Sequence, residues 1–127
     1  MAVAGIGVDV MDVPRMEVQA RDAGFLAGLF TPAEIAYCQA RHHPARYLAG
    51  LFAAKEAFFK ALGVDGKRGL AWREVEILND GSGHSEIALH GALSETARRR
   101  EVGAIHLSLS HTRSMAIAQL VLESNQA

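Results

Sequence analysis

The segment LAGLFAAKEAFFKALG, residues 48–63, predicts the helix around which the rest of the chain is organised. It contains no proline, its only interior glycine is Gly50, and most of its residues favour helix. At 100° per residue the large apolar side chains fall on one broad arc, as in a helix packed against a core; they are Leu48, Leu51, Phe52, Phe58, Phe59 and Leu62. We expect this helix to begin near Ala45 and to end at Leu62, with Gly63 as its cap.

Three charged residues interrupt the helix pattern. Glu56 and Lys60 lie one turn apart at the edge of the apolar arc, beside the small side chains of Ala49 and Ala53. An open groove there would let the carboxylate bind a metal and the ammonium bind a phosphate, whereas the alternative is an ordinary helical ion pair. Lys55 falls inside the arc, which leaves three alternatives open: a snorkelling lysine, a structural ion pair or a phosphate-binding ion pair.

The first segment, AVAGIGVDV at residues 2–10, predicts a strand. Alternation places Gly5, Gly7 and Asp9 on one face and apolar side chains on the other. Glycines in a strand often mark the close approach of a ligand or of another backbone. Asp9 therefore either ends the strand or stands at a site that the glycines clear. The glycines do not form a dinucleotide fingerprint, because GxGxxG is incomplete.

Composition limits the class of protein. The chain has 127 residues, half of them hydrophobic, which predicts one domain spanning residues 1–127 with a real core. A net charge of −1 argues against nucleic acid as a partner. The single cysteine, Cys38, excludes an internal disulfide and fits a reducing compartment. No apolar run is long enough to span a bilayer. We expect a cytoplasmic protein with no membrane partner.

The remaining elements predict an α+β fold, with an antiparallel sheet packed against the long central helix. Thr31, Pro32 and Glu34 form a capping box that opens a helix through about Arg41. The other expected elements are a helix at 13–23 stopped by Gly24, strands at 72–78 and 85–89, a helix at 91–101, a strand at 105–110, a turn at 111–114 and a strand at 115–123.

Two carboxylates, Asp9 and Glu56, interrupt otherwise apolar elements. Two carboxylates with room for water suit Mg²⁺, which takes oxygen ligands. Lys60 would offset charge on a phosphate. His111 follows HLSLS at a strand-to-turn corner, where a side chain is either presented to a ligand or simply structural. The other histidines lack metal-ligand spacing, and no nucleophile elbow is present.

Three motifs in this order resemble those of the small 4′-phosphopantetheinyl transferases: GIGVDVMDVPR, LAGLFAAKEAFFKALG and HLSLSHT. The resemblance covers nearly the whole chain and implies the fold of that family. It also implies transfer of 4′-phosphopantetheine from coenzyme A to a serine of apo acyl carrier protein, by a homotrimer with active sites between subunits. The carrier protein would serve either fatty acid biosynthesis or polyketide synthesis.

The resemblance also assigns roles residue by residue. Asp9 and Glu56 correspond to the Mg²⁺ ligands and, with Lys60 and His111, make up the catalytic set. Contacts with coenzyme A are implied for Lys60, His111, Gly63 and Arg46. Arg15 and Arg21, in the helix predicted at 13–23, correspond to the surface that meets the acidic carrier protein.

Two positions depart from the family pattern. Leu51 stands where the family commonly has arginine, which removes one coenzyme contact, and Arg46, Lys67 or Arg68 are candidates to replace it. Phe59 stands where a small residue is common. Leu51 favours one alternative, a trimeric binding module with weakened catalysis. A more remote alternative is a metal-dependent hydrolase that uses the same carboxylates.

Overall fold

The computed structural model describes residues 2–64 and 70–126. Its elements, in chain order, are β1 (Val3–Asp12), α1 (Val13–Gln19), α2 (Ala23–Leu29), α3 (Pro32–Gln39), α4 (Pro44–Leu62), α5 (Leu70–Glu74), β2 (Val75–Asn79), β3 (Ser85–Leu89), α6 (Gly91–Arg99), β4 (Val102–His111) and β5 (Met115–Ser124). The predicted α+β class with antiparallel strands is confirmed. No helix among the described residues is both long and apolar enough to cross a membrane.

The strands form two antiparallel sheets rather than the single sheet that was expected. One sheet has the order β1-β5-β4, and the hairpin β2-β3 forms the other. In the larger sheet Ala118 of β5 pairs with Asp9 on one side and Leu109 on the other. The β3 and β4 strands lie near each other, but α6 separates them along the chain and no ladder joins them.

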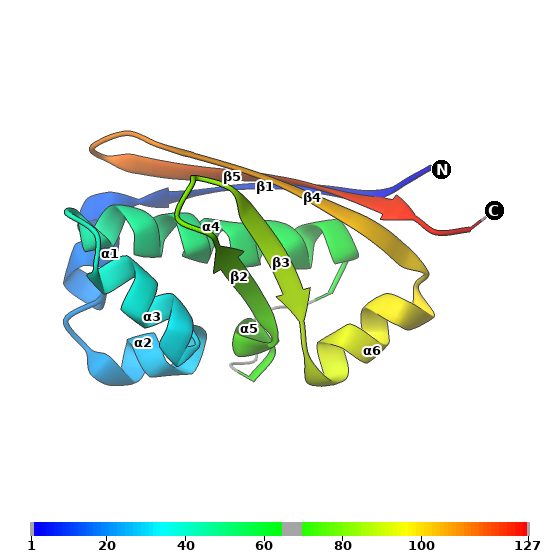
Figure 1. The fold of residues 1–127 in the computed structure, drawn as a ribbon, viewed down its shortest axis with the longest axis horizontal. Coiled ribbons are helices and arrows are strands. Elements are labelled where there is room, and N and C mark those ends of the chain that lie inside the picture. Colours follow the sequence, from blue (N-terminus) through cyan, green and yellow to red (C-terminus); the bar gives the residue numbers. More distant parts are fainter. Residues whose placement is uncertain (1, 65–69, 127) are drawn as a thin grey trace.

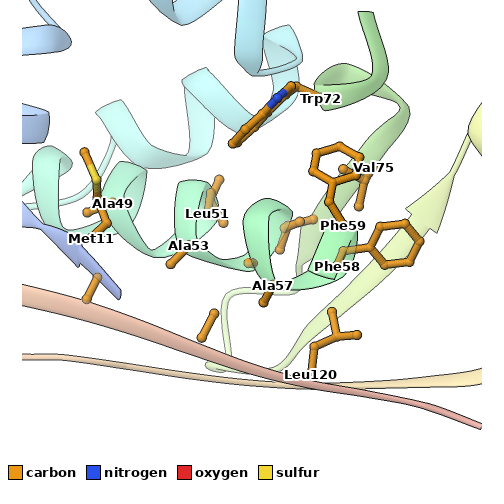
Figure 2. Close-up of a cluster of buried hydrophobic side chains, with 14 of the residues drawn as sticks. Met11, Ala49, Leu51, Ala53, Ala57, Phe58, Phe59, Trp72, Val75 and Leu120 are labelled. Carbon is orange, nitrogen blue, oxygen red and sulfur yellow. The ribbon is translucent and has the colours of Figure 1, made fainter. Parts of the chain in front are cut away.

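Helix α4 lies between the larger sheet and the remaining elements (Figure 1). Figure 2 shows Trp72 and Val75 on one side of the helix and Leu120 of β5 on the other. Because both sides are covered, most of the 19 residues of α4 are buried, which explains its wide apolar arc. Pro44 opens the helix, and Gly63 closes it with a left-handed φ of 77°, as expected from a glycine cap.

The predicted helix at 13–23 is wrong in its second half. Helix α1 ends at Gln19, and α2 begins at Ala23. Asp22 causes the break, because its carboxylate accepts hydrogen bonds from the backbone N–H groups of Gly24, at 2.8 Å, and Phe25, at 3.3 Å. Gly24 therefore lies in the first turn of a new helix and does not stop the old one.

The strand predicted at 72–78 begins only at Val75, because the preceding residues form α5. The other errors concern ends of elements. Strand β1 continues to Asp12 and β4 begins at Val102, while His111 is the last residue of β4 rather than the first of a turn. The capping box of α3 is confirmed, with both of its hydrogen bonds present.

Candidate active site

The glycine face of β1 packs directly on α4. A β-carbon built on Gly5 would clash with the carbonyl oxygen of Ala61, and one on Gly7 with that of Ala57. The two glycines therefore admit another backbone and not a ligand. Asp9 lies on the same face, two residues beyond Gly7. The strand thus carries its carboxylate to the side of α4.

The small residues of α4 serve the same contact. Ala49 and Ala53 are fully buried. Figure 2 shows Ala53 and Ala57 on the side of the helix that faces β5. The open groove expected beside Ala49 and Ala53 is therefore not present, since the sheet covers these side chains.

Asp9 and Lys60 form an ion pair across this contact. The Lys60 Nζ donates to Asp9 Oδ1 at 2.9 Å and to the carbonyl oxygen of Val8 at 3.2 Å. The side chain of Lys60 is 54 % exposed and that of Asp9 is 16 % exposed. The hydrogen bond and charge of Asp9 raise the pKa of Lys60. Lys60 thus pairs with Asp9, 51 residues away in sequence. It does not form the ordinary helical ion pair with Glu56 that was one of the two alternatives from the sequence.

Glu56 is half-buried beside this pair. Burial raises the pKa of its carboxyl above the ordinary value, and the negative charge of Asp9 raises it further, while Lys60 lowers it. The surroundings of Glu56 therefore stabilise its ionised form less than water does, and an added cation would stabilise that form.

These two carboxylates fit Mg²⁺ in the way that ion is commonly held. Among the described residues no group of three or more acidic, histidine or cysteine side chains gathers at one point. Mg²⁺ is usually bound by one or two carboxylates, with waters and substrate phosphates filling its other positions. Asp9 and Glu56 could therefore hold Mg²⁺ together with a phosphate, although they could not form a closed protein cage.

A second group of predicted residues meets at the other end of α4. His111 packs edge-on against Tyr47, with ring centroids 5.3 Å apart. Both rings line a pocket of ≈ 240 Å³, together with Arg46 and Leu51. Ten residues of helix separate Arg46 from Glu56, which corresponds to about 15 Å. The expected site is therefore divided into two groups in the single chain.

The sequence did not single out two aromatic residues of this pocket. Tyr37 of α3 and Tyr47 of α4 stack edge-on at 6.3 Å, and the guanidinium of Arg41 lies over the Tyr37 ring at 4.4 Å. Tyr37 also lines the pocket. Both tyrosines occur among apolar helical residues, where an aromatic ring is indistinguishable from a core residue.

The other predicted contacts are scattered. Gly63 lies at the C-terminal end of α4, far from Arg46, and its N–H donates to the carbonyl oxygen of Phe59. Arg15 is exposed on α1, and Arg21 follows that helix and lines a larger pocket near Arg46. Lys67 and Arg68 lie outside the described residues.

Lys55 is a structural residue, so its snorkelling alternative is wrong. Its side chain is completely buried, and its Nζ donates to Glu34 Oε1 at 2.9 Å and to the carbonyl oxygens of Trp72, at 2.7 Å, and Val75, at 2.8 Å. Glu34 Oε2 accepts in turn from the N–H of Ile77 at 2.8 Å. Burial lowers the pKa of Lys55, while Glu34 opposes that shift. An ammonium enclosed in this way cannot meet a phosphate.

The two departures from the family pattern lie in the core. Phe59 is buried and stacks edge-on against Trp72, with ring centroids 5.4 Å apart. Leu51 is buried at the wall of the His111 pocket. Phe59 therefore fills core volume, and Leu51 contributes no charge to the pocket it lines.

Comparison with known proteins identifies the class to which this fold and these residues belong. The profile of the 4′-phosphopantetheinyl transferase superfamily matches residues 5–118. The chain therefore belongs to this superfamily.

Particular relatives narrow the similarity. The chain is 43 % identical over 121 residues to a holo-[acyl-carrier-protein] synthase of Geotalea daltonii, covering 94 % of this chain and 97 % of the relative. Its fold matches the crystal structure of a Neisseria meningitidis holo-[acyl-carrier-protein] synthase with a TM-score of 0.85 at 30 % identity, covering 96 % and 99 % of the two chains. A Bacillus anthracis holo-(acyl-carrier-protein) synthase in complex with coenzyme A (3′,5′-ADP) matches with a TM-score of 0.80 at 29 % identity, covering 98 % and 100 %.

Proposed function

We propose that this chain, as one domain spanning residues 1–127, transfers 4′-phosphopantetheine from coenzyme A to a serine of apo acyl carrier protein. The serine oxygen forms a bond to the β-phosphorus, the pyrophosphate bond breaks, and adenosine 3′,5′-bisphosphate leaves. The observation that carries the proposal is the convergence of Asp9, Glu56 and Lys60, in a chain similar to synthases of this kind. Charge neutralisation and positioning dominate such phosphoryl transfers.

Asp9 and Glu56 are the proposed Mg²⁺ ligands. When bound, the ion would neutralise charge that develops on the pyrophosphate. Lys60 sits beside both carboxylates with its side chain half exposed, so its ammonium can reach a phosphate oxygen. Glu56 is the proposed acceptor of the serine proton, directly or through a water.

Arg46 and His111 are the proposed contacts for the remainder of coenzyme A, with Gly63 a third and more remote one. Their pocket is lined by Tyr37 and Tyr47, and aromatic faces suit a nucleotide base. Because about 15 Å of helix separates this pocket from Glu56, a coenzyme that used both would have to be extended or to pass between subunits.

A homotrimer is the proposed assembly, and the outer face of the larger sheet supports it. Strand β1 exposes Ile6, Val8 and Val10 on the side away from α4, with exposed fractions of 70 %, 53 % and 47 %. Met115 and Ile117 of β5 are also exposed, and Val10 pairs with Ile117. An apolar face of this extent is typical of a protein–protein contact, and closed symmetry would bury it in every subunit.

The proposed surface for the carrier protein comprises Arg15 and Arg21. Arg15 is exposed on α1, and an acidic partner would be steered by such cations. We also propose that the protein works in the cytoplasm. Cys38, the only cysteine, supports this, because a chain without an internal disulfide fits a reducing compartment.

The alternative is a trimeric binding module of the same fold with weakened catalysis. It is favoured by Leu51, which leaves Arg46 as the only arginine or lysine among the described residues that line the His111 pocket.

One experiment separates these functions. The protein is incubated with coenzyme A, Mg²⁺ and apo carrier protein, and the carrier is analysed by mass spectrometry. A phosphopantetheine adduct is the expected result. Coenzyme hydrolysis without an adduct would identify a metal-dependent hydrolase, and binding of coenzyme A without either product would identify the binding module.

A further inference from the structure

The C-terminal end of α4 carries two residues of the proposed site, Lys60 and Gly63. This is the unfavourable end of a helix for an anion. Its last carbonyl groups carry a partial negative charge, equivalent to about half an elementary charge. Phosphates are normally bound at the opposite end, where the backbone N–H groups point outward. A coenzyme phosphate at the end of α4 therefore requires positive charge from elsewhere in the chain.

The guanidinium of Arg100 lies against this end of α4. The N–H of Gly63 closes the helix by donating to the carbonyl oxygen of Phe59 at 2.9 Å. The carbonyl oxygen of Leu62, the last residue of the helix, instead accepts a hydrogen bond from Nη1 of Arg100, 38 residues away in sequence. A β-carbon built on Gly63 would lie 3.7 Å from the same Nη1. Arg100 thus caps α4 from outside the helix.

Arg100 is held in this place by α6, of which it is the C-cap. At the start of α6, the N–H of Leu93 donates to the carboxylate of Glu74 at 3.0 Å. At its end, the chain turns at Glu101, the only residue other than glycine with a positive φ, 58°, in the described part of the chain. The carbonyl oxygen of Glu101 accepts from the N–H of Asn125 at 2.9 Å. Figure 1 shows this α6–β4 junction and the end of α4 at the same end of the molecule.

The charge of Arg100 is not offset by a carboxylate, unlike that of its neighbours. Arg98 and Arg99 both pair with Glu95 on the same helix. Arg100 forms no ion pair with any residue in 2–64 or 70–126, and the contact recorded for it there is the one with α4. A full positive charge therefore stands beside the partial negative charge of the helix end, which is the arrangement that stabilises a helix C-terminus.

We propose that Arg100 is a positioning residue for coenzyme A in the proposed transfer reaction, on which this role rests. It offsets the negative end of α4, so that Lys60 and Gly63 can accept a coenzyme phosphate there. Leu62 lies two residues beyond Lys60, about 3 Å further along the helix axis. Lys60 is itself paired with Asp9, so part of its charge is already used. Arg100 acts through the helix end and does not need to touch the coenzyme.

Two substitutions at this position separate the charge from the shape of the guanidinium. Arg100→Gln keeps a polar side chain and removes the charge, whereas Arg100→Lys keeps the charge and loses the planar fork. The matched control is Arg99→Gln, which removes the same charge from the next residue of α6, where the arginine pairs with Glu95. All three variants should fold, because both arginine side chains are exposed.

The measurement is the affinity for coenzyme A, by calorimetry without carrier protein so that no transfer occurs. At low ionic strength Arg100→Gln should bind about three- to fivefold more weakly, the range expected for one charge at a helix end. Arg100→Lys and Arg99→Gln should bind like the parent. The loss in Arg100→Gln should shrink as salt is added, because salt screens charges at an exposed site. A purely structural loss would not depend on salt in this way.

Transfer kinetics give a second readout. Arg100→Gln should raise KM for coenzyme A and leave kcat nearly unchanged, since Arg100 contributes to binding and not to the bond that breaks. An unchanged affinity in Arg100→Gln would overturn the proposal, as would an equal loss in Arg100→Lys or in Arg99→Gln. A parent protein that binds coenzyme A but transfers nothing would contradict the proposed function alone, because the affinities of the variants would still decide whether Arg100 positions the coenzyme.

Discussion

Lys55 and Glu56 are adjacent on α4, yet the structure places them in opposite environments. Lys55 points into the core, where Glu34 and two carbonyl oxygens satisfy its ammonium. Glu56 lies half-buried beside Asp9 and Lys60, and its pKa is raised. The comparison teaches that a charged residue on a helix is structural where every donor and acceptor around it is satisfied. It is available for a ligand where, as at Glu56, the surroundings leave its charge incompletely neutralised.

The largest expected effect comes from removing the negative charge of Asp9 or of Glu56. Asp9→Asn and Glu56→Gln keep shape and should reduce Mg²⁺-dependent transfer by about 10³-fold, since each removes a negative charge that would hold Mg²⁺ beside the reacting phosphate. Metal-free stability of Glu56→Gln should be unchanged or slightly higher, and the stabilisation by Mg²⁺ should shrink in both. Paired thermal melts with and without Mg²⁺, beside a transfer assay, measure this. Near-parental activity with the same metal shift would place the site elsewhere.

The next effect concerns the buried pair. Lys55→Ala should lower the free energy of unfolding by about 3–5 kcal/mol, because it leaves the Glu34 carboxylate buried and unpaired. Replacing both charges, as in Lys55→Met with Glu34→Leu, should recover only part of that loss, because Glu34→Leu also removes the acceptor of the Ile77 N–H and the capping box of α3. Denaturant titration is the measurement. A loss smaller than about 1 kcal/mol, the value of an exposed pair, would remove the distinction between the two environments.

The contact between β1 and α4 positions Asp9 beside Glu56, and a substitution at Gly7 tests this contact. Gly7→Ala places a methyl group against the carbonyl oxygen of Ala57, so the strand must move away from the helix. We expect a loss of about 1–3 kcal/mol in stability and weaker Mg²⁺ binding, because Asp9 follows on the same strand. Gly28→Ala is the control: it lies in α2 with no atom within 4 Å of the added carbon, and should be neutral or stabilising. Equal effects of the two substitutions would contradict the close contact.

The smallest expected effect on stability comes from Lys60. Lys60→Met should change the free energy of unfolding by less than about 1 kcal/mol, because its ion pair is largely exposed. It should nevertheless raise the pKa of Glu56 further in the metal-free protein, since Lys60 now lowers it. NMR titration of the Glu56 carboxyl checks this. An unchanged or lower pKa would mean that Lys60 does not act on Glu56.

The same carboxyl makes stability depend on pH in a predictable direction. The folded-state pKa of Glu56 is above its ordinary value, so the folded chain binds the proton more tightly than the unfolded chain. The stability that the folded chain gains from this tighter proton binding is therefore fully present below the ordinary pKa of glutamate. It is lost as pH rises through the folded-state pKa of Glu56. Glu56→Gln should remove this part of the pH dependence in melts without metal.

Sequence by itself determined the elements whose signals are local. The capping box of Thr31 and Glu34 spans three residues, and the arc of α4 repeats every turn, so both could be predicted from the chain. The glycines before Asp9 indicated a close approach, and the three motifs indicated the family. Helix α2 and the late start of β2 differ from the prediction, because Asp22 caps a new helix and α5 contains the first residues of the predicted strand.

Only the tertiary structure decided which charges meet. Lys55 finds Glu34, 21 residues away, and Lys60 finds Asp9, 51 residues away. The division of the expected site between the two ends of α4 also depends on how distant elements pack. The physical reason is range: caps and periodicity act within one helical turn, whereas burial and the neutralisation of a charge depend on every element packed against it.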